Sequence, residues 1–389
     1  MHSALLLLPL LPLGLAAPAK PSQPAPLLIP RGQVIANRYI VKYKKTFSVA
    51  SADHTLKVLS AGADRIYETV FHGFSGTLNE STVERLRQHP DVEYIEKDAL
   101  FTIDSFVEQT GAPWGLNRVS HHLSKGSNYV YDDSAGEGTC SYIIDTGVDD
   151  SHPDFEGRAQ FLRSFVEGQN ADGHGHGTHV AGTIGSRSYG VAKRTRLLGV
   201  KVLSDEGSGS GSDIIAGMDY AVQDSRQRGA CAKGALANMS LGGGYSQALN
   251  DAAAQMIRAG VFLGVAAGNS HEDAAGFSPA SEPTVCTVGA TDSSDGLSSY
   301  SNFGSLVDVL APGSGILSTW PGGKTNTISG TSMATPHIVG LAAYLAGLEG
   351  FPGAEALCTR IQNLATRNAI RNVPGGTVNL VGFNGNPSG

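Results

Sequence analysis

The sequence predicts an α/β domain with a doubly wound, mostly parallel sheet and helices on both faces, preceded by a small α+β module. In the C-terminal two-thirds of the chain, near-continuous apolar runs alternate with amphipathic helical stretches. This alternation is typical of parallel strands that are covered on both faces. The N-terminal third instead has short patterns in the order β, α, β, β, α, β, which indicates a compact ferredoxin-like arrangement.

The chain begins with an apolar run that is too short and too rich in proline to span a bilayer. Small residues follow the run, so we interpret residues 1–17 as a secretory signal peptide. The alternative is a buried helix, which Pro9 and Pro12 would interrupt. We therefore expect a secreted, extracellular protein without a membrane partner. Residues 18–106 would then form the small module, which starts with a proline-rich linker, and residues 107–389 the α/β domain.

The charge distribution argues against a nucleic-acid partner. The formal net charge is −7 and no block of basic residues occurs, so there is no cationic surface to attract phosphate. From position 107 onward the chain has 17 basic and 25 acidic residues. The acidity therefore belongs to the larger domain.

The small module has strand patterns at 37–43, 64–70, 73–79 and 91–100, and helical patterns at 54–62 and 81–89. Ser81 begins the second helix and Glu84 follows three residues later. This spacing predicts a capping box, in which the two residues satisfy the first amides of the helix.

The larger domain has polar residues where its apolar strands end. We predict strands at 139–146, 196–203, 235–241, 261–268 and 284–290, and helices at 176–185, 212–226, 246–260 and 331–347. Asp145 and Asn269 follow strands, whereas His176 and Ser332 each begin a helical pattern. Active crevices of such sheets lie outside the carboxyl ends of the strands. These residues should therefore meet at one edge.

Asp145, His176 and Ser332 have the chemistry of a nucleophilic site. A serine hydroxyl needs a base within hydrogen-bond reach, and the base needs a carboxylate that fixes its tautomer. Gly330 would let the backbone turn tightly and place the hydroxyl at a helix N-terminus, which favours developing negative charge. We place Pro336 in the first turn of that helix, where its nitrogen needs no intrahelical bond.

In order along the chain, IIDTGV, GHGTHVAGTI, SLGGG, AAGNS and SGTSMATPHIVG resemble the motifs of the subtilisin-like serine proteases. The chain is most similar to the proteinase K group of secreted fungal enzymes. The resemblance implies a subtilisin-like fold for residues 107–389, with Ser332 as nucleophile, His176 as general base and Asp145 as the orienting carboxylate. Asn269 would hold the oxyanion together with the Ser332 amide. The preceding module is similar to the inhibitory propeptide of the family, which also aids folding.

The resemblance also indicates how substrate binds. SLGGG and the run Gly207–Ser212 look like the two family strands that flank an extended peptide, although a flexible surface loop is the alternative for the second. Small residues in VAAGN leave room for a large apolar side chain, so we expect broad specificity with large apolar or aromatic residues before the scissile bond. Cleavage between Phe106 and Val107 would fit this preference. The expected substrate-binding residues are Gly207, Ser208, Gly209, Ser240, Leu241, Gly242, Ala266, Ala267 and Gly268.

Four cysteines in an exported chain predict disulfides. Their spacing alone allows three pairings. The family pattern selects Cys140 with Cys231 and Cys286 with Cys358. Relatives often have a free cysteine where this chain has Val180.

By resemblance, the chain should bind one structural calcium ion. Asp308 and the carbonyls of Pro283 and Val285 match the stronger site of the proteinase K group, and calcium prefers such oxygen ligands. A solvated aspartate is the alternative. A second family site needs an acid where this chain has Ala369, so we expect that site to be absent.

Two glycosylation sequons occur, at Asn79 and Asn238. Asn238 falls in a strand that we expect to be buried, which argues against modification there, and Asn79 falls in the removable module.

Two other functions compete with a monomeric serine endopeptidase that acts on proteins and peptides. A zinc hydrolase could use the cluster His174, His176 and His179, but no HExxH motif occurs and flanking glycines make a poor ligand frame. A catalytically dead binding protein is opposed by the presence of every expected catalytic residue. We expect His179 to pack beneath the site and His174 to be solvated.

Overall fold

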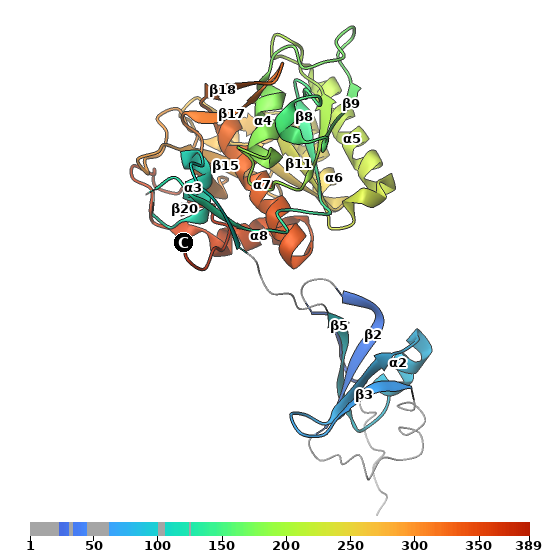
Figure 1. Ribbon diagram of the computed structural model, residues 1–389. Coiled ribbons are helices and arrows are strands. Elements are labelled where there is room, and N and C mark those ends of the chain that lie inside the picture. Colours follow the sequence, from blue (N-terminus) through green and yellow to red (C-terminus); the bar gives the residue numbers. More distant parts are fainter. Residues whose placement is uncertain (1–22, 31–33, 45–61, 100–105, 124–125) are drawn as a thin grey trace, which may run out of the picture. The chain divides into compact units, whose positions relative to one another are not determined.

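The computed structural model describes residues 23–30, 34–44, 62–99, 106–123 and 126–389, which divide into two compact units (Figure 1). The N-terminal unit is Met1–Phe101 and the C-terminal unit is Thr102–Gly389. Each unit has its own hydrophobic core. The expected signal peptide and nearly all of the helix expected at 54–62 lie outside the described residues.

The described part of the N-terminal unit contains a five-stranded sheet in the order β1-β5-β2-β4-β3. Helix α2 (Glu80–Arg87) packs on β5 and buries Val83 and Leu86. The four expected strands and the second expected helix are confirmed. The expected strands are β2 (Val34–Tyr43), β3 (Ala63–Tyr67), β4 (Gly73–Thr77) and β5 (Val92–Ala99). The fifth strand, β1 (Leu27–Leu28), was not predicted.

The predicted capping box at Ser81 and Glu84 is wrong. The N-cap of α2 is Asn79, whose Oδ1 accepts hydrogen bonds from the Thr82 amide at 2.9 Å and the Ser81 hydroxyl at 2.7 Å. Glu84 instead pairs with Arg87, one turn further along the helix. Asparagine caps helices as well as serine does, and here it comes first as the chain leaves β4.

The described residues of the C-terminal unit form a nine-stranded sheet in the order β19-β20-β16-β15-β13-β11-β8-β10-β9. Neighbouring strands are parallel except β19 and β20. The mostly parallel sheet is thus confirmed. Its strands are β8 (Cys140–Asp145), β9 (Ala159–Ser164), β10 (Arg196–Lys201), β11 (Ala235–Met239), β13 (Val261–Ala266), β15 (Cys286–Thr291), β16 (Val309–Pro312), β19 (Thr366–Arg367) and β20 (Leu380–Val381).

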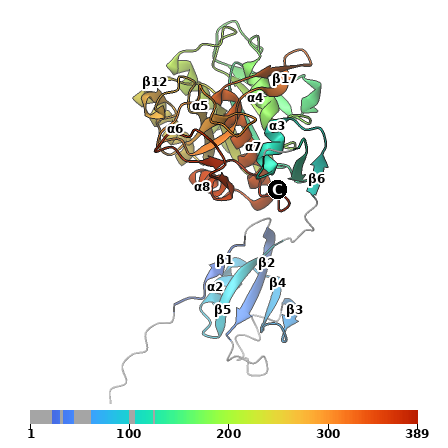
Figure 2. The ribbon, with the colours of Figure 1, turned by 90° about the vertical axis from the view of Figure 1, so that its left-hand side faces the viewer.

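Helices cover both faces of this sheet, as predicted (Figures 1 and 2). Helices α4 (His176–Gly185) and α7 (Thr331–Glu349) pack on each other and on the central strands. Helices α5 (Gly211–Gln227) and α6 (Gln247–Arg258) form a second pair on the other side. Helices α3 (Trp114–Ser120) and α8 (Ala354–Leu364) complete the unit.

Short elements surround the sheet. Three two-stranded pairs occur among the described residues: β6 (Phe106–Gln109) with β7 (Tyr129–Asp132), β12 (Gly243–Gly244) with β14 (Phe277–Ser278), and β17 (Ile316–Trp320) with β18 (Lys324–Ile328). Single 3-10 turns occur at Pro153–Phe155, Gly229–Cys231 and Ala274–Gly276. Helix α5 already begins at Gly211, so the run expected to flank substrate ends one residue earlier, at its N-cap Ser210. No helix in the described part combines the length and apolarity needed to cross a bilayer.

Both disulfides form as the resemblance implied. Cys140 pairs with Cys231 and Cys286 pairs with Cys358, and none of the four cysteines is free. The first bond joins the start of β8, which ends at Asp145, to the turn after α5. The second joins β15 to α8. Each bond therefore links the sheet to an outer element.

Candidate active site

Asp145 and His176 meet at the carboxyl edge of the sheet. Asp145 is the last residue of β8 and is fully buried, and His176 is the first residue of α4. His176 Nδ1 lies 2.8 Å from Asp145 Oδ1, which also accepts the Thr146 amide at 2.7 Å. Burial alone would lower the pKa of His176, but the Asp145 carboxylate raises it above its ordinary value. The pair is therefore arranged to stabilise an imidazolium.

Gly175 makes this placement possible. It is the N-cap of α4 and has a φ of 97°, a region that glycine adopts without strain. A Cβ there would lie 2.4 Å from the Trp320 ring. The loop before His176 therefore packs closely on β17 because the residue has no side chain.

Ser332 is the second residue of α7 and is bonded to Ser240, which follows β11. The Ser332 hydroxyl donates to the Ser240 carbonyl at 3.1 Å, and the Ser240 hydroxyl donates to the Ser332 carbonyl at 2.8 Å. Among the described residues no hydrogen bond joins Ser332 to His176. Such bonds are often absent without substrate and form in the reactive complex.

The predicted first-turn position of Pro336 is wrong. Helix α7 begins at Thr331, so Pro336 is its sixth residue and cannot donate the helical bond to the Ser332 carbonyl. That carbonyl accepts the Ser240 hydroxyl instead. The missing helical bond is thus replaced by a bond from a neighbouring segment.

Gly330 does not form the expected tight turn, because its backbone is extended, with φ 160° and ψ 162°. The entry to α7 is held by Asn269, whose Oδ1 accepts the Thr331 amide at 2.8 Å and the Thr331 hydroxyl at 2.9 Å. These two bonds fix the orientation of the side-chain amide. The nitrogen Nδ2 would lie 3.7 Å from a Cβ at Gly330, so it is close to the start of α7.

The other two histidines of the cluster have different surroundings. His179 is fully buried, and its Nε2 donates to the carbonyls of Ile316 at 3.0 Å and Asn326 at 3.2 Å. Burial lowers its pKa to about 4, so it is neutral and joins α4 to the β17–β18 hairpin. His174 is exposed, as expected. The three histidines do not converge on a point where one metal ion could bind.

A cavity of about 200 Å³ opens beside Ser332. No charged side chain lines it. We call it the glycine-lined pocket. It contains the predicted residues Ala266, Ala267, Gly268 and Asn269, and β12 and β14 form one wall. Sequence reasoning did not find Phe277 and Ser278 on that wall, because nothing in their local pattern marks them. The complete lining is Leu241, Gly242, Gly243, Gly244, Ala266, Ala267, Gly268, Asn269, Ser270, Phe277, Ser278, Thr331 and Ser332.

A wider groove of about 490 Å³ adjoins this pocket. We call it the histidine groove, because His174 and His176 line it. Its two edges contain the predicted residues Gly207, Ser208 and Gly209 on one side and Ser240, Leu241 and Gly242 on the other. All nine predicted substrate-binding residues therefore line one of the two hollows. The remaining lining residues are Thr146, Leu203, Glu206, Ile214, Asn269 and Ser332.

Asp308 lies apart from these hollows, next to the Cys286–Cys358 disulfide. Its Oδ2 accepts the Thr287 amide at 2.8 Å, and burial raises the pKa of its carboxyl to about 6. The disulfide sulfurs cannot act as thiolate ligands, so the donors at this position are oxygens. Asp308 Oδ1 also accepts a hydrogen bond from Gln362 Nε2 at 3.3 Å. The carboxylate is the type of ligand that a hard cation such as calcium prefers.

Comparisons with known proteins agree with this geometry. Residues 136–383 match the peptidase S8 or subtilase family, and residues 38–104 match the peptidase inhibitor I9 family. A cuticle-degrading protease of Metarhizium anisopliae is 57% identical, with 97% of this chain and 98% of the relative covered. A subtilisin-like serine protease of Sarocladium strictum is 60% identical, with 99% of both chains covered.

The structure of a cold-adapted subtilisin-like serine proteinase is also similar, with a TM-score of 0.66 and 45% sequence identity. The match covers 71% of this chain and 99% of that one. Both the sequence and the fold of the C-terminal unit therefore have counterparts among proteases of one type. The chain belongs to the subtilase family of serine proteases and has an inhibitor I9 domain at its N-terminal side.

Proposed function

We propose that this subtilase is a secreted, monomeric serine endopeptidase that is made as a zymogen and cleaves proteins and peptides with broad specificity. In this proposal Ser332 is the nucleophile, His176 the general base and then acid, and Asp145 the carboxylate that orients the imidazole. The single observation that supports it most is the 2.8 Å bond between His176 and Asp145 at the edge where Ser332 begins α7.

The reaction starts when the Ser332 hydroxyl leaves the Ser240 carbonyl and turns toward His176 Nε2. Oγ attacks the substrate carbonyl while its proton passes to His176, and Asp145 stabilises the imidazolium that forms. The carbonyl oxygen becomes an oxyanion between the Asn269 amide and the Ser332 N–H. His176 then gives its proton to the leaving amine, and a water molecule hydrolyses the acyl-enzyme by the same steps in reverse.

The glycine-lined pocket supports a preference for large apolar or aromatic side chains before the scissile bond. Its lining has small residues and no charge to pair with a basic or acidic side chain. An unpaired ion would lose its hydration there without compensation. The extended substrate would lie in the histidine groove, between the Gly207–Gly209 edge and the Ser240–Gly242 edge.

The remaining expectations belong to the same proposal. Residues 1–17 are removed on export, residues 18–106 inhibit the enzyme and assist its folding, and maturation cuts before Val107. Phe106 and Val107 pair with Asp132 and Tyr131 of β7, so cleavage requires β6 to detach first. Asp308, together with the carbonyls of Pro283 and Val285, would hold a structural calcium ion that neutralises its half-buried carboxylate.

The test is to express the full chain in a protease-free host as wild type and as Ser332→Ala. We expect the variant to lose peptide hydrolysis and to keep residues 18–106 attached, and we expect an organofluoride inhibitor to label Ser332 in the wild type. Ser225→Ala is the control, because that hydroxyl bonds within α5 at 2.8 Å, and it should be fully active. Normal processing of Ser332→Ala would contradict autocatalytic maturation, and inactivation by a zinc chelator would favour a metal hydrolase.

A further inference from the structure

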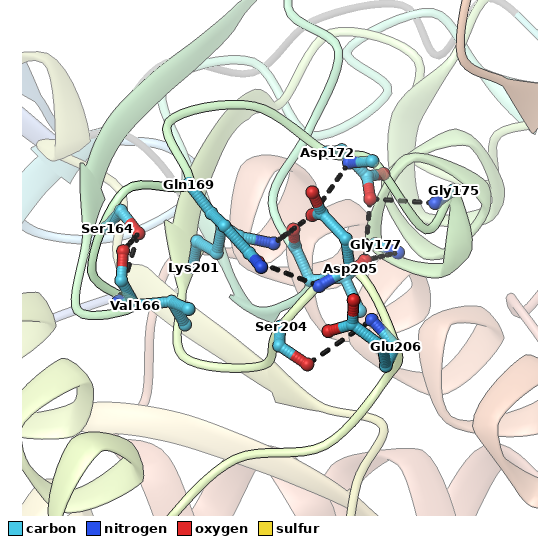
Figure 3. A network of polar contacts seen from close by, with 12 residues as sticks. Ser164, Val166, Gln169, Asp172, Gly175, Gly177, Lys201, Ser204, Asp205 and Glu206 are labelled. Atoms are coloured by element: carbon cyan, nitrogen blue, oxygen red, sulfur yellow. Dashed lines mark hydrogen bonds and ion pairs between the residues drawn. The ribbon is translucent and has the colours of Figure 1, made fainter.

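Lys201 is a buried charge that the proposed mechanism does not use. It is the last residue of β10, and its side chain is 0% exposed. Its ammonium donates to the Thr146 carbonyl at 2.7 Å. It also donates to Asp205 Oδ1 at 2.8 Å (Figure 3). A buried ammonium is tolerated only where such acceptors compensate for its lost hydration. The two acceptors therefore show which segments Lys201 holds together.

The first acceptor belongs to the turn behind the candidate triad. Lys201 lies beside Asp145 in the register of β10 and β8, and Thr146 follows Asp145. The Thr146 hydroxyl donates to Asp172 Oδ1 at 2.8 Å and accepts the Gly177 amide at 2.9 Å. Lys201 thus holds a turn that contacts the chain on both sides of His176.

Asp172 is the second buried charge of this network. Its carboxylate accepts the Gly175 amide at 2.8 Å (Figure 3). It also accepts the Thr178 amide at 2.9 Å and the Thr178 hydroxyl at 2.5 Å. These residues surround His176 in the sequence. The position of the imidazole is therefore determined by hydrogen bonds that continue through Thr146 to Lys201.

The second acceptor belongs to the loop that forms one edge of the histidine groove. Asp205 Oδ1 also accepts the Gly173 amide at 3.1 Å, and the Asp205 amide donates to Gln169 at 2.8 Å. A Cβ at Gly173 would lie 2.4 Å from the Asp205 carboxylate, so the two segments touch. The hydrogen bond from Lys201 lowers the pKa of Asp205, which keeps the pair ionic.

Main-chain bonds also hold this loop. Just before it, the Val202 and Leu203 amides donate to the Asp145 carbonyl at 2.8 and 3.1 Å. The Ser204 amide donates to the Ser208 carbonyl at 2.7 Å, and the Gly207 amide donates to the Ser204 carbonyl at 2.9 Å. The two bonds within the loop set its shape, and the bonds to Asp145 fix only the point where the loop begins. The Asp205 side chain bonds the loop to Lys201 of β10 and to Gly173, which lies in the segment before His176.

We propose that Lys201 and Asp205 are positioning residues that hold the Gly207–Gly209 edge in register with the candidate triad. The inference rests on the proposed function, because it assumes that substrate lies along this edge. It predicts a dependence on substrate length. A single amino-acid ester occupies only the glycine-lined pocket, whereas a tetrapeptide also needs the Gly207–Gly209 edge.

The experiment compares a tetrapeptide anilide with an N-acyl amino-acid ester that has the same residue before the scissile bond. Wild type, Asp205→Ala, Asp205→Asn and Lys201→Met are expressed as the full chain and allowed to mature. Active-site titration with an organofluoride inhibitor gives the concentration of functional enzyme, so misfolded material does not count. Asp205 is 37% exposed, which makes its variants the safer ones for folding.

We expect Asp205→Ala to lower kcat/KM for the tetrapeptide about tenfold, mostly through KM, since small misplacements of binding groups cost up to about 100-fold. The kcat/KM of Asp205→Ala for the ester should differ from that of the wild type by less than about twofold. Asp205→Asn keeps an acceptor oxygen for Lys201 and Gly173, so it should recover most of the loss. Lys201→Met should affect the tetrapeptide at least as much and should also slow the ester, because Thr146 loses its partner.

Glu349→Ala is the matched control. It removes an ion pair with Arg360 at the far end of α7, about 25 Å along the helix from Ser332. The kcat/KM values for both substrates should therefore stay the same as in the wild type. Equal losses for the two substrates in Asp205→Ala, or no loss for either, would overturn the inference. Wild type would still hydrolyse both substrates in that case, so the outcome is distinct from a failure of the proposed function.

Discussion

The Ser240 hydroxyl donates a 2.8 Å hydrogen bond to the Ser332 carbonyl, and the Ser240 carbonyl accepts the Ser332 hydroxyl at 3.1 Å. The first bond replaces the helical bond that Pro336 cannot make. The second directs the hydroxyl of the candidate nucleophile to the Ser240 carbonyl. Two residues 92 positions apart in the sequence therefore determine the geometry of the hydroxyl.

Ser240→Ala should destabilise the protein because the Ser332 carbonyl would lose its partner. We expect a loss of about 1 to 3 kcal/mol in the free energy of unfolding, measured by urea denaturation of enzyme treated with a serine-directed inhibitor. Pro336→Ala restores an N–H that can bond to this carbonyl, so the double variant should be more stable than the sum of the two single changes predicts. Additive effects would contradict this explanation of the Ser240 bond.

Asp145→Asn should change both the rate and its pH dependence. In the wild type, burial lowers the pKa of His176, but the carboxylates of Asp145 and Asp172 together raise it above its ordinary value, with Asp145 contributing more. The base is neutral only above that raised pKa, so kcat/KM should fall as the pH drops through a value above the ordinary histidine value of about 6.5. In the variant, the His176 pKa should fall, as followed by NMR, and kcat should drop about 10⁴-fold. An unchanged imidazole titration would show that the carboxylate does not act on His176.

Asn269 should be tested with two substitutions, because its oxygen bonds to Thr331 and its nitrogen is the proposed oxyanion donor. Asn269→Asp keeps the oxygen that accepts the Thr331 amide and hydroxyl but removes the proposed oxyanion donor. We expect kcat to fall about 100- to 1,000-fold with KM nearly unchanged. Asn269→Ala should lose the same rate and also lower the midpoint of thermal unfolding. Full activity of Asn269→Asp would rule out the side-chain amide as an oxyanion donor.

Calcium removal should lower thermal stability through Asp308. The buried carboxyl has a pKa raised to about 6 by burial, and a bound cation would favour its ionised form. We expect a calcium chelator to lower the Tm of the wild type, and re-addition of calcium to restore it. Asp308→Asn should have the lower Tm from the start and should not respond to the chelator. An equal response of both proteins would place the stabilising calcium elsewhere.

Phe106 tests both the pocket and the proposed maturation site. Phe106→Leu keeps a large apolar side chain and should mature at a rate close to that of the wild type. Phe106→Asp would place a carboxylate in the glycine-lined pocket, whose lining has no cation, so cleavage before Val107 should slow by about 100-fold or more. Mass spectrometry of the mature N-terminus checks the site directly. Equal processing of both variants at Val107 would show that this pocket does not select the bond.

Local sequence patterns were enough to predict the main elements of the larger domain. The helix predicted at 176–185 has the same bounds as α4, four predicted strands contain β8, β10, β11 and β13, and the fifth covers all of β15 except Thr291. Apolar periodicity is a local property, so it can be read without knowing what each face contacts. The motifs alone were also enough to predict that Asp145, His176 and Ser332 lie at the ends of their elements.

Only the tertiary structure decided which distant groups meet. Three features join segments whose local sequence patterns give no sign of their contact. They are the bond from Ser240 to Ser332, the Lys201–Asp205 ion pair and the wall of the glycine-lined pocket at Phe277. The error at Ser81 has the same origin, because the start of α2 depends on where the preceding chain leaves β4. Sequence determined the elements and the chemistry of the site, whereas long-range packing determined its hydrogen bonds and the boundaries of its cavities.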